Sequence, residues 1–291
     1  MTVAVAIASF RDAALVEACL ASVVPQAEAH GARVVVARPA SAPVPSPLQD
    51  RFPEVRFVTC AEADVPRLRG TAIAHAAADL VAVTEDHCVA APGWLDALVH
   101  AKKASGADVV GGGMGNARRT RAIDWAAYFS EYGFFSWTRP ADTRASGVPL
   151  LTGANVAYGR PVLADVTSWT LDGTWENVCH DRLHAQGHAI AFAPAARVLQ
   201  NHTYRFGAFC RDRYEHGRDY AMARLVEHED GRWRRLAMTP LLPAVLVARV
   251  ARASAGIAPG AFARALPVTL LFLGAWAVGE AVGYARGRTR R

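Results

Sequence analysis

The sequence lacks the cysteine patterns that stabilise small secreted domains or hold structural zinc. Its cysteines are odd in number, lie far apart and never form a C-x-x-C pair. They are Cys19, Cys60, Cys88, Cys179 and Cys210. Neither a disulfide framework nor a zinc site is therefore expected, and the spacing predicts a chain that works in the reducing cytosol. No basic segment precedes the first apolar run, so we expect no secretory signal.

Lysine is nearly absent, and the formal net charge of +6 comes from arginine. Many of the arginines crowd the last quarter of the chain. Among them are Arg232, Arg234, Arg235, Arg249, Arg252, Arg286, Arg288, Arg290 and Arg291. No helix-turn-helix or zinc-finger spacing accompanies them, so the chain is not expected to bind nucleic acid. An anionic lipid surface is the expected partner of this basic region.

Strand and helix patterns alternate along most of the chain, and a 52% hydrophobic content indicates a sizeable core. Short apolar runs predict strands at 2–8, 33–37, 55–59, 80–84, 108–111 and 189–199, and apolar residues at helical spacing predict helices at 13–24, 67–78 and 93–105. This alternation predicts an α/β fold with a mostly parallel sheet and helices on both faces. Residues 117–149 show no clear period and are interpreted as an irregular segment over an active site.

The character of the chain changes near its C-terminal end, where residues 240–250 and 266–284 are apolar. The second stretch is just long enough to cross a bilayer, which takes about 20 residues. A pair of buried helices in a soluble protein is one interpretation. An interfacial or spanning hairpin is the other, and the flanking arginines favour it. We expect a catalytic domain over residues 1–225 and a helical membrane-associated region over residues 226–291.

An acidic pair and an imidazole, Glu85-Asp86-His87, follow the predicted strand at 80–84. Ligands bind at the carboxyl ends of strands in such sheets. Oxygen and imidazole ligands suit Mg²⁺ or Mn²⁺, which could bridge a diphosphate. The alternative is that Glu85 caps a turn while Asp86 and His87 are solvated, and on the tripeptide alone this alternative is favoured.

Two other acidic or imidazole positions are candidates for chemistry. Glu176 follows Trp175 at the start of a predicted helix, where it could act as a general base if its surroundings raise its pKa. A carboxylate that complements the helix dipole is the commoner alternative. His202 follows the strand at 189–199, where a lone histidine is more often structural than a ligand. The glycine-rich run at 111–115 lacks a dinucleotide-binding spacing and indicates close backbone packing beside a bound donor.

Taken in order, these motifs resemble the family 2 glycosyltransferases of the GT-A fold over roughly residues 1–225. Residues 3–11 are similar to the family's first strand and nucleotide-contacting turn, and residues 80–87 to its strand that ends in Asp-x-Asp. The donor-binding residues that this resemblance implies are Ser9, Arg11, Arg69, Asp86, Asn155 and Arg182. The implied metal ligands are Asp86, His87 and His202, which would hold Mn²⁺ or Mg²⁺.

The resemblance makes Glu176 the general base of an inverting transfer. A membrane-associated, bacterial-type hexosyltransferase is then expected at the cytoplasmic face of the inner membrane. It would move a sugar from a nucleotide sugar to a membrane-proximal, lipid-linked or polysaccharide acceptor. Two residues depart from the family pattern. His87 stands where the pattern has Asp, and Arg38 follows the second strand where an acidic residue usually reads the nucleobase.

Two other functions are weighed against this one. A degenerate, non-catalytic module that binds a nucleotide sugar or a partner is favoured by the two departures and disfavoured by the retained Glu176 and Asp86. A nucleotidyltransferase would need a Gly-rich basic loop after the first strand, where this chain has Ser9-Phe10-Arg11-Asp12. That interpretation ranks last.

Overall fold

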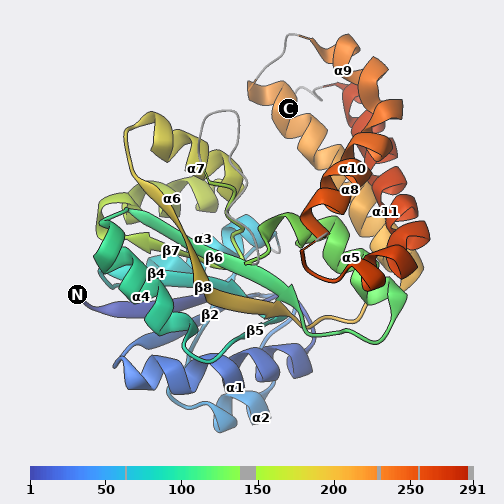
Figure 1. Cartoon of the computed structure of the whole chain (residues 1–291). Helices are drawn as coiled ribbons and strands as arrows, with labels where there is room; N and C mark the ends of the chain where they lie inside the picture. Colours follow the sequence, from blue (N-terminus) through green and yellow to red (C-terminus); the bar gives the residue numbers. More distant parts are fainter. Residues whose placement is uncertain (63, 138–148, 228–230, 255, 288–291) are drawn as a thin grey trace. The chain divides into compact units, whose positions relative to one another are not determined.

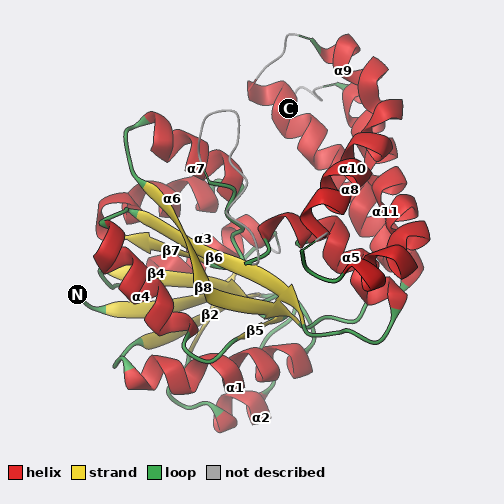
Figure 2. Cartoon of the chain, in the orientation of Figure 1, coloured by secondary structure: helices red, strands yellow, loops and turns green. Residues whose placement is uncertain are grey.

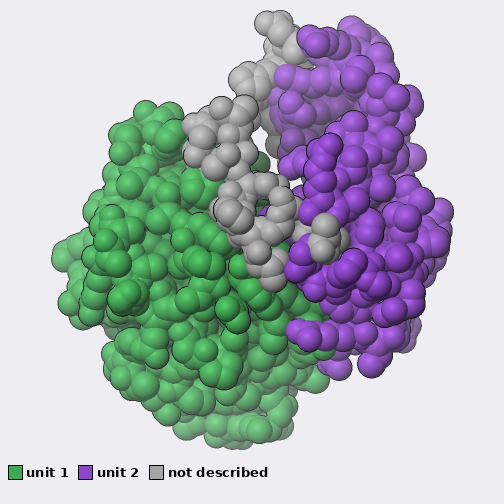
Figure 3. All heavy atoms as spheres, viewed as in Figure 1, with its two compact units in different colours: residues 1–117, 135–202 green, residues 118–134, 203–291 purple. Residues whose placement is uncertain are grey.

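The computed structural model describes residues 1–62, 64–137, 149–227, 231–254 and 256–287 (Figure 1). The chain divides into two compact units, Met1–Ala117 with Phe135–His202 and Arg118–Phe134 with Thr203–Arg291, which Figure 3 shows in different colours. A segment from the middle of the sequence thus packs with the C-terminal helices. The division of function at residue 225 stays a prediction.

The first unit is built on an eight-stranded sheet with the order β3-β2-β1-β4-β7-β6-β8-β5 (Figure 2). The strands are β1 (Val3–Ala8), β2 (Arg33–Pro39), β3 (Arg56–Cys60), β4 (Leu80–Glu85), β5 (Cys88–Ala90), β6 (Val109–Asn116), β7 (Val156–Gly159) and β8 (Ile190–Gln200). β1 to β4 pair in parallel, as do β6 and β8, whereas β7 runs antiparallel to both β4 and β6, and β5 antiparallel to β8. The predicted α/β fold is confirmed, as a mixed sheet.

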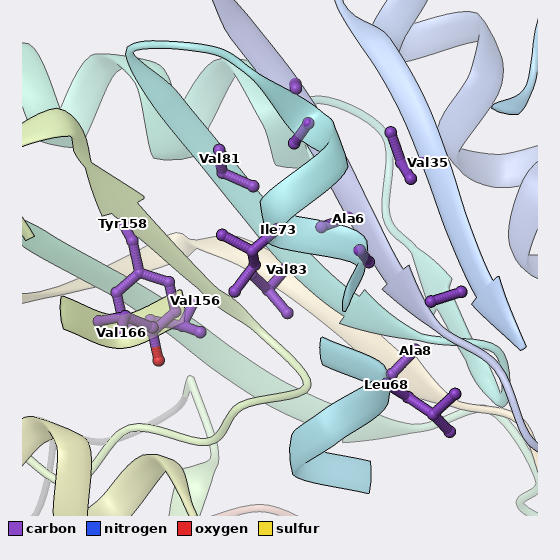
Figure 4. Close-up of a cluster of buried hydrophobic side chains, with 14 of the residues drawn as sticks. Ala6, Ala8, Val35, Leu68, Ile73, Val81, Val83, Val156, Tyr158 and Val166 are labelled. Atoms are coloured by element: carbon purple, nitrogen blue, oxygen red, sulfur yellow. The ribbon is translucent and has the colours of Figure 1, made fainter. Parts of the chain in front are cut away.

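Helices cover both faces of this sheet. The helices of the first unit are α1 (Ala13–Ala29), α2 (Ser46–Arg51), α3 (Val65–Ala76), α4 (Trp94–Ser105), α6 (Arg160–Leu171) and α7 (Glu176–Ala185). α3 and α6 pack on one face and α1 and α4 on the other. Between the sheet and the α3–α6 layer, side chains such as Val83, Val156, Leu68 and Val166 form a buried apolar cluster (Figure 4). This cluster packs α3 and α6 against β1 and β4.

The first helix is longer than the sequence predicts, because it continues through Pro25 to Ala29. Tertiary contacts offset the hydrogen bond that proline cannot donate. The Gln26 side-chain amide donates to the Ala91 carbonyl and accepts from the Leu95 backbone N–H. The residues after the proline are thereby tied to the neighbouring segment.

All the regular secondary structure in the described residues of the second unit is helical. It contains α5 (Ala122–Glu131), η1 (Gly133–Phe135, whose last residue belongs to the first unit), α8 (Phe206–Glu227), α9 (Arg232–Met238), η2 (Thr239–Leu241), α10 (Leu242–Ser254) and α11 (Pro259–Arg286). By length and composition α11 could cross a membrane.

The expectation that residues 117–149 are irregular is wrong for residues 122–131, which form α5, while residues 138–148 lie outside the described ones. Trp125, Tyr128, Phe129 and Tyr132 recur at helical spacing and are buried. The Trp125 and Phe129 rings stack with their centroids 5.2 Å apart. The aromatic residues therefore form one face of a short helix.

Candidate functional site

Asp86 organises the edge of the sheet where β1 and β4 end. The two strands are parallel neighbours with Ala8 opposite Glu85, so both chains leave the sheet together. The buried Asp86 Oδ2 accepts hydrogen bonds from Ser9 Oγ (2.9 Å), the Phe10 N–H (2.7 Å) and the Arg11 N–H (2.6 Å). Burial raises the pKa of Asp86. The interaction with His87 and the hydrogen bonds from Arg11 and Ser9 lower the pKa by more, so that the net pKa lies below the usual value. Asp86 is thus an ionised carboxylate that shapes the β1–α1 turn.

Glu85 and His87 are also buried beside Asp86, so the alternative that Asp86 and His87 are solvated is wrong. His87 Nδ1 lies 3.5 Å from Glu85 Oε2 and 3.7 Å from Asp86 Oδ1. Burial lowers the pKa of His87, but the Cys88 thiol and the carboxylates of Asp86 and Glu85 raise it above its usual value overall. The three side chains form one compact polar cluster.

Arg69 connects this cluster to Glu176. From α3 its Nη2 donates to Glu85 Oε1, and its Nη1 donates to Glu176 Oε2 at 2.6 Å. The Arg69 side chain is only 6% exposed. Gly153 leaves room for it, since a Cβ at that position would come within 2.3 Å of the guanidinium carbon. One buried cation is therefore shared by two carboxylates from separate elements.

Glu176 is the first residue of α7, and its side chain is 16% exposed. Burial alone raises the pKa of this carboxyl, yet the charge and hydrogen bond of Arg69 outweigh burial and lower the pKa. The sequence interpretation required a raised pKa for a general base, and here the direction is the opposite. While Arg69 stays paired, Glu176 is an ionised hydrogen-bond acceptor.

His180 and Tyr158 are site neighbours that the sequence analysis missed. Both are buried, and Tyr158 Oη lies 3.0 Å from His180 Nε2. His180 follows Glu176 by four residues on α7, hence on the same helix face, and contributes to lowering the pKa of Glu176. The i, i+4 spacing of acid and histidine was the available signal. Burial, then Cys179 and Glu176, raises the pKa of Tyr158 well above its usual value.

Arg38, which departs from the family pattern, is held in the β1–α1 turn. Its Nη1 donates to Ser9 Oγ at 2.7 Å and its Nη2 to the Arg11 carbonyl at 3.1 Å. Ser9 is therefore bonded to Asp86 on one side and to Arg38 on the other. Arg38 braces the loop in which Ser9 and Arg11 lie.

Asn155 and Arg182 are both expected near a donor, but Asn155 is buried and Arg182 is exposed. The buried Asn155 side chain accepts from Trp94 Nε1 and donates to the carbonyls of Gly113 and Ala196. Its hydrogen bonds fix the loop before β7 against β6. Arg182 is exposed on α7, where its guanidinium lies over the Trp169 ring at 5.3 Å.

His202 follows a residue that is hydrogen-bonded to the backbone of His87. Cys88 pairs with Gln200 across β5 and β8, and the Asn201 N–H donates to the His87 carbonyl at 2.7 Å. The chain therefore brings residue 202 to the same edge of the sheet as His87. The glycine run lies on β6, where a Cβ on Gly112 would come within 1.9 Å of the Ala196 carbonyl oxygen, so close backbone packing is confirmed there.

No group of three or more His, Cys, Asp or Glu side chains within the described residues is arranged to hold a metal by itself. Asp86 Oδ1, however, is buried without a hydrogen bond from the described residues and faces the His87 ring nitrogen. A carboxylate oxygen and an imidazole nitrogen are ligands that suit Mn²⁺. These residues fit an ion that takes its remaining ligands from a substrate and water.

Comparison with known sequences decides the family. Residues 1–218 match the family described as Glycosyltransferase like family 2. The chain belongs to this family. It is a glycosyltransferase, and the order of motifs that indicated one is thereby confirmed. The comparison with curated proteins found no match.

The fold of this glycosyltransferase is similar to that of the solved structure of the mannosyltransferase PcManGT from Pyrobaculum calidifontis in complex with GDP-Man and Mn²⁺. The TM-score is 0.58 at 19% sequence identity, and the match covers 96% of this chain and 86% of the other. The predicted GT-A architecture is thus confirmed.

Proposed function

We propose that this glycosyltransferase transfers a sugar from a nucleotide-sugar donor to an acceptor hydroxyl with inversion. The observation that carries the proposal is that Asp86 and the Arg69–Glu176 ion pair lie at the same edge of the sheet, the edge where β1 and β4 end. Ionised Asp86 holds the β1–α1 turn, and Arg69 joins the same cluster to Glu176. A donor bound there would have both an anion-binding region and a carboxylate within one site. The GDP-Man in the similar mannosyltransferase structure supports this choice of donor class.

In the proposed complex the donor lies against Ser9, Arg11, Arg69 and Asp86. Arg69 supplies a fixed positive charge for the diphosphate, and the turn positions the nucleotide. Asn155 is proposed to act indirectly, by fixing the position of its loop, because its side chain is hydrogen-bonded to other protein groups. Contact between Arg182 and the donor remains a prediction.

Asp86 and His87, with His202 next along the edge, are the proposed ligands of Mn²⁺ or Mg²⁺. Asp86 Oδ1, which accepts no hydrogen bond from the described residues and lies 3.7 Å from His87 Nδ1, supports this assignment, as does the Mn²⁺ in the similar structure. When bound, a divalent ion neutralises the charge that develops on a departing diphosphate. The protein's own part is to keep Asp86 ionised through the Ser9 and Arg11 contacts.

Glu176 is the proposed general base for the acceptor hydroxyl. Its low pKa in the Arg69 pair makes it a weak base in this structure. A donor diphosphate would compete with Glu176 for Arg69, and loss of the pair would raise the pKa of the buried carboxyl. Donor binding would then precede and enable proton removal.

The acceptor is proposed to be membrane-proximal, either lipid-linked or a polysaccharide, with the enzyme at the cytoplasmic face of the membrane. The support is the apolar helix α11 and the surrounding arginines. This proposal concerns location and does not affect the chemistry.

The test is Glu176→Gln, with Glu17→Gln on the exposed surface of α1 as the matched control. We expect transfer by the Glu176 variant to fall about 10²- to 10⁴-fold, the usual contribution of a general base. Donor binding should persist, measured as thermal stabilisation, which reaches about 2.7 kcal/mol at 100 times the Kd. Unchanged transfer in Glu176→Gln would remove it from the mechanism.

The alternative of a non-catalytic binding module is favoured by the low pKa of Glu176 and by His87 in place of Asp. It predicts that nucleotide sugars stabilise the protein but are neither transferred nor hydrolysed. Donor turnover without acceptor, followed with and without Mn²⁺, distinguishes the two functions.

A further inference from the structure

Helices α8 and α11 approach each other at backbone contact. A Cβ on Gly279 would come within 2.0 Å of the Tyr214 carbonyl oxygen, and one on Gly217 within 2.3 Å of the Trp276 carbonyl oxygen. Phe209 packs edge-on against Phe272 with the ring centroids 4.5 Å apart. These contacts extend along most of α8, so the second half of α11 has this helix as a close neighbour.

The helix that covers α11 is strongly charged. Between residues 211 and 224 α8 carries Arg211, Asp212, Arg213, Glu215, Arg218, Asp219 and Arg224. Arg213 lies over the Trp276 ring of α11 at 4.5 Å and forms an ion pair with Glu131 of α5 at 3.6 Å. Charged groups are therefore part of the packing around α11.

This packing argues against α11 crossing a bilayer. If α11 spanned, the α8 segment packed beside it would enter the hydrocarbon with its charges. Each Arg or Asp at the bilayer centre lowers insertion about a hundredfold. Several such charges together oppose insertion far more than the apolar face of α11 favours it.

The opposite face of α11 is apolar and exposed. Pro267, Leu270, Leu271 and Val278 are exposed on this helix, and Glu280, the single charged residue between 265 and 285, is buried. Large apolar side chains are also exposed on the preceding helices. They are Trp233, Met238, Leu241 and Val245. Because α9 and α10 both contact α11, these exposed side chains lie on neighbouring helices and make the helices a candidate interaction site.

The charge of the same helices identifies the partner. Residues 231–287 contain seven arginines, one glutamate, no aspartate and no lysine. Exposed Arg234 stands beside exposed Trp233 on α9, and exposed Arg249 and Arg252 follow the apolar residues of α10. Apolar side chains bordered by tryptophan and arginine fit the interface of an anionic membrane.

We propose that α9, α10 and α11 bind the surface of an anionic bilayer and lie in its interface without crossing it. The apolar residues exposed on these helices, Trp233, Met238, Leu241, Val245, Leu270, Leu271 and Val278, enter the headgroup region. The arginines contact lipid phosphates. The proposal is independent of the sugar-transfer reaction.

Vesicle co-sedimentation of the full chain tests the surface. We expect strong binding to phosphatidylcholine vesicles that contain phosphatidylglycerol and weak binding to phosphatidylcholine alone. Each arginine neutralised, beginning with Arg234→Gln, should weaken binding about fivefold. Leu270→Glu should weaken it further, whereas Leu171→Glu, a leucine of matched exposure (44% and 42%) on α6, should not. Equal binding to both vesicle types would refute the role of charge.

Topology is tested by labelling single cysteines at the two ends of α11 in reconstituted vesicles. Ala263→Cys and Ala285→Cys, in a Cys210→Ser background, place exposed thiols about 33 Å apart, a distance that exceeds the hydrocarbon thickness. A membrane-impermeant maleimide should label both from the same side. Labelling from opposite sides would establish a spanning helix and overturn the proposal. The proposal is also overturned if the protein does not bind vesicles and sediments as a dimer that Leu270→Glu dissociates, because the surface then binds a second copy of the chain.

Discussion

Replacing Arg69 with methionine removes the cation that Glu85 and Glu176 share, while keeping most of the side chain's volume. Two buried carboxylates would then lose their partner at once. Breaking a buried pair by removing one member typically costs about 3–5 kcal/mol. For a protein of this size each kcal/mol lowers Tm by about 2–4 °C, so Arg69→Met should melt about 6–20 °C below wild type.

The deficit should depend on pH with a definite sign. In the wild type the pKa of Glu176 is lowered, so its ion pair stabilises the fold above about pH 4.3, the usual Glu pKa, and this contribution is lost as the pH falls through the lowered value. In Arg69→Met, burial without a cation raises the pKa of Glu176 above its unfolded value. The free-energy cost of the buried, unpaired carboxylate in the variant therefore disappears as acid protonates it. The difference in stability should be largest at neutral pH and shrink below about pH 5.

Thermal unfolding from pH 4 to pH 8 measures both effects. The matched control is Arg160→Met, which breaks an exposed pair with Asp79 in which the arginine side chain is 82% exposed. Exposed pairs contribute about 0–1 kcal/mol, so this control should change Tm little. An Arg69→Met deficit no larger than that of the control, or one that grows as the pH falls, would refute the account of Arg69 as a shared buried cation.

Further substitutions test other parts of the structure. Asp86→Asn should abolish metal-dependent stabilisation by nucleotide sugar, because the carboxylate that accepts hydrogen bonds from the β1–α1 turn becomes an amide that is partly a hydrogen-bond donor. The control Asp96→Asn on α4 should not have this effect. Differential scanning fluorimetry with nucleotide sugar and Mn²⁺ measures both variants. Gly279→Ala should destabilise the protein by about 1–3 kcal/mol through the clash with α8, whereas Gly274→Ala in the same helix, with open space around it, should stabilise it by up to about 1 kcal/mol in denaturant titrations. Asn155→Ala should cost about 2–4 kcal/mol by leaving buried groups unsatisfied; a loss of donor binding without loss of stability would contradict its structural role.

The sequence predicted the framework of the first unit because its strands are short apolar runs with clear ends. β1 and β4 carry almost uninterrupted apolar residues, and their parallel pairing brings Ser9 next to Asp86 as expected for strand ends at one edge. β7 was not recognised from residues 156–159, since four residues give no measurable period. Its antiparallel course depends on long-range pairing with β4 and β6.

The electrostatics of the site were beyond the sequence. Arg69 and Glu176 are separated by 107 residues, and only folding shows that they pair. The direction of the Glu176 pKa follows from that contact, which local composition does not encode. The Tyr158–His180 contact likewise joins β7 to α7. In the second unit, α5 was hidden because its aromatic residues indicated a ligand-covering loop more strongly than a helix face.

The close approach of α8 and α11 bears on how this enzyme can be shortened. A chain cut near residue 225, to remove the candidate membrane helix α11, would keep α8 without its partner. Phe209, Ala221 and Leu225, all buried in the intact protein, would lose the cover that Phe272, Gly283 and Tyr284 provide. Such a chain is expected to aggregate, whereas substitution of Leu270 or Leu271 by polar residues keeps this packing and is the better route to a soluble enzyme.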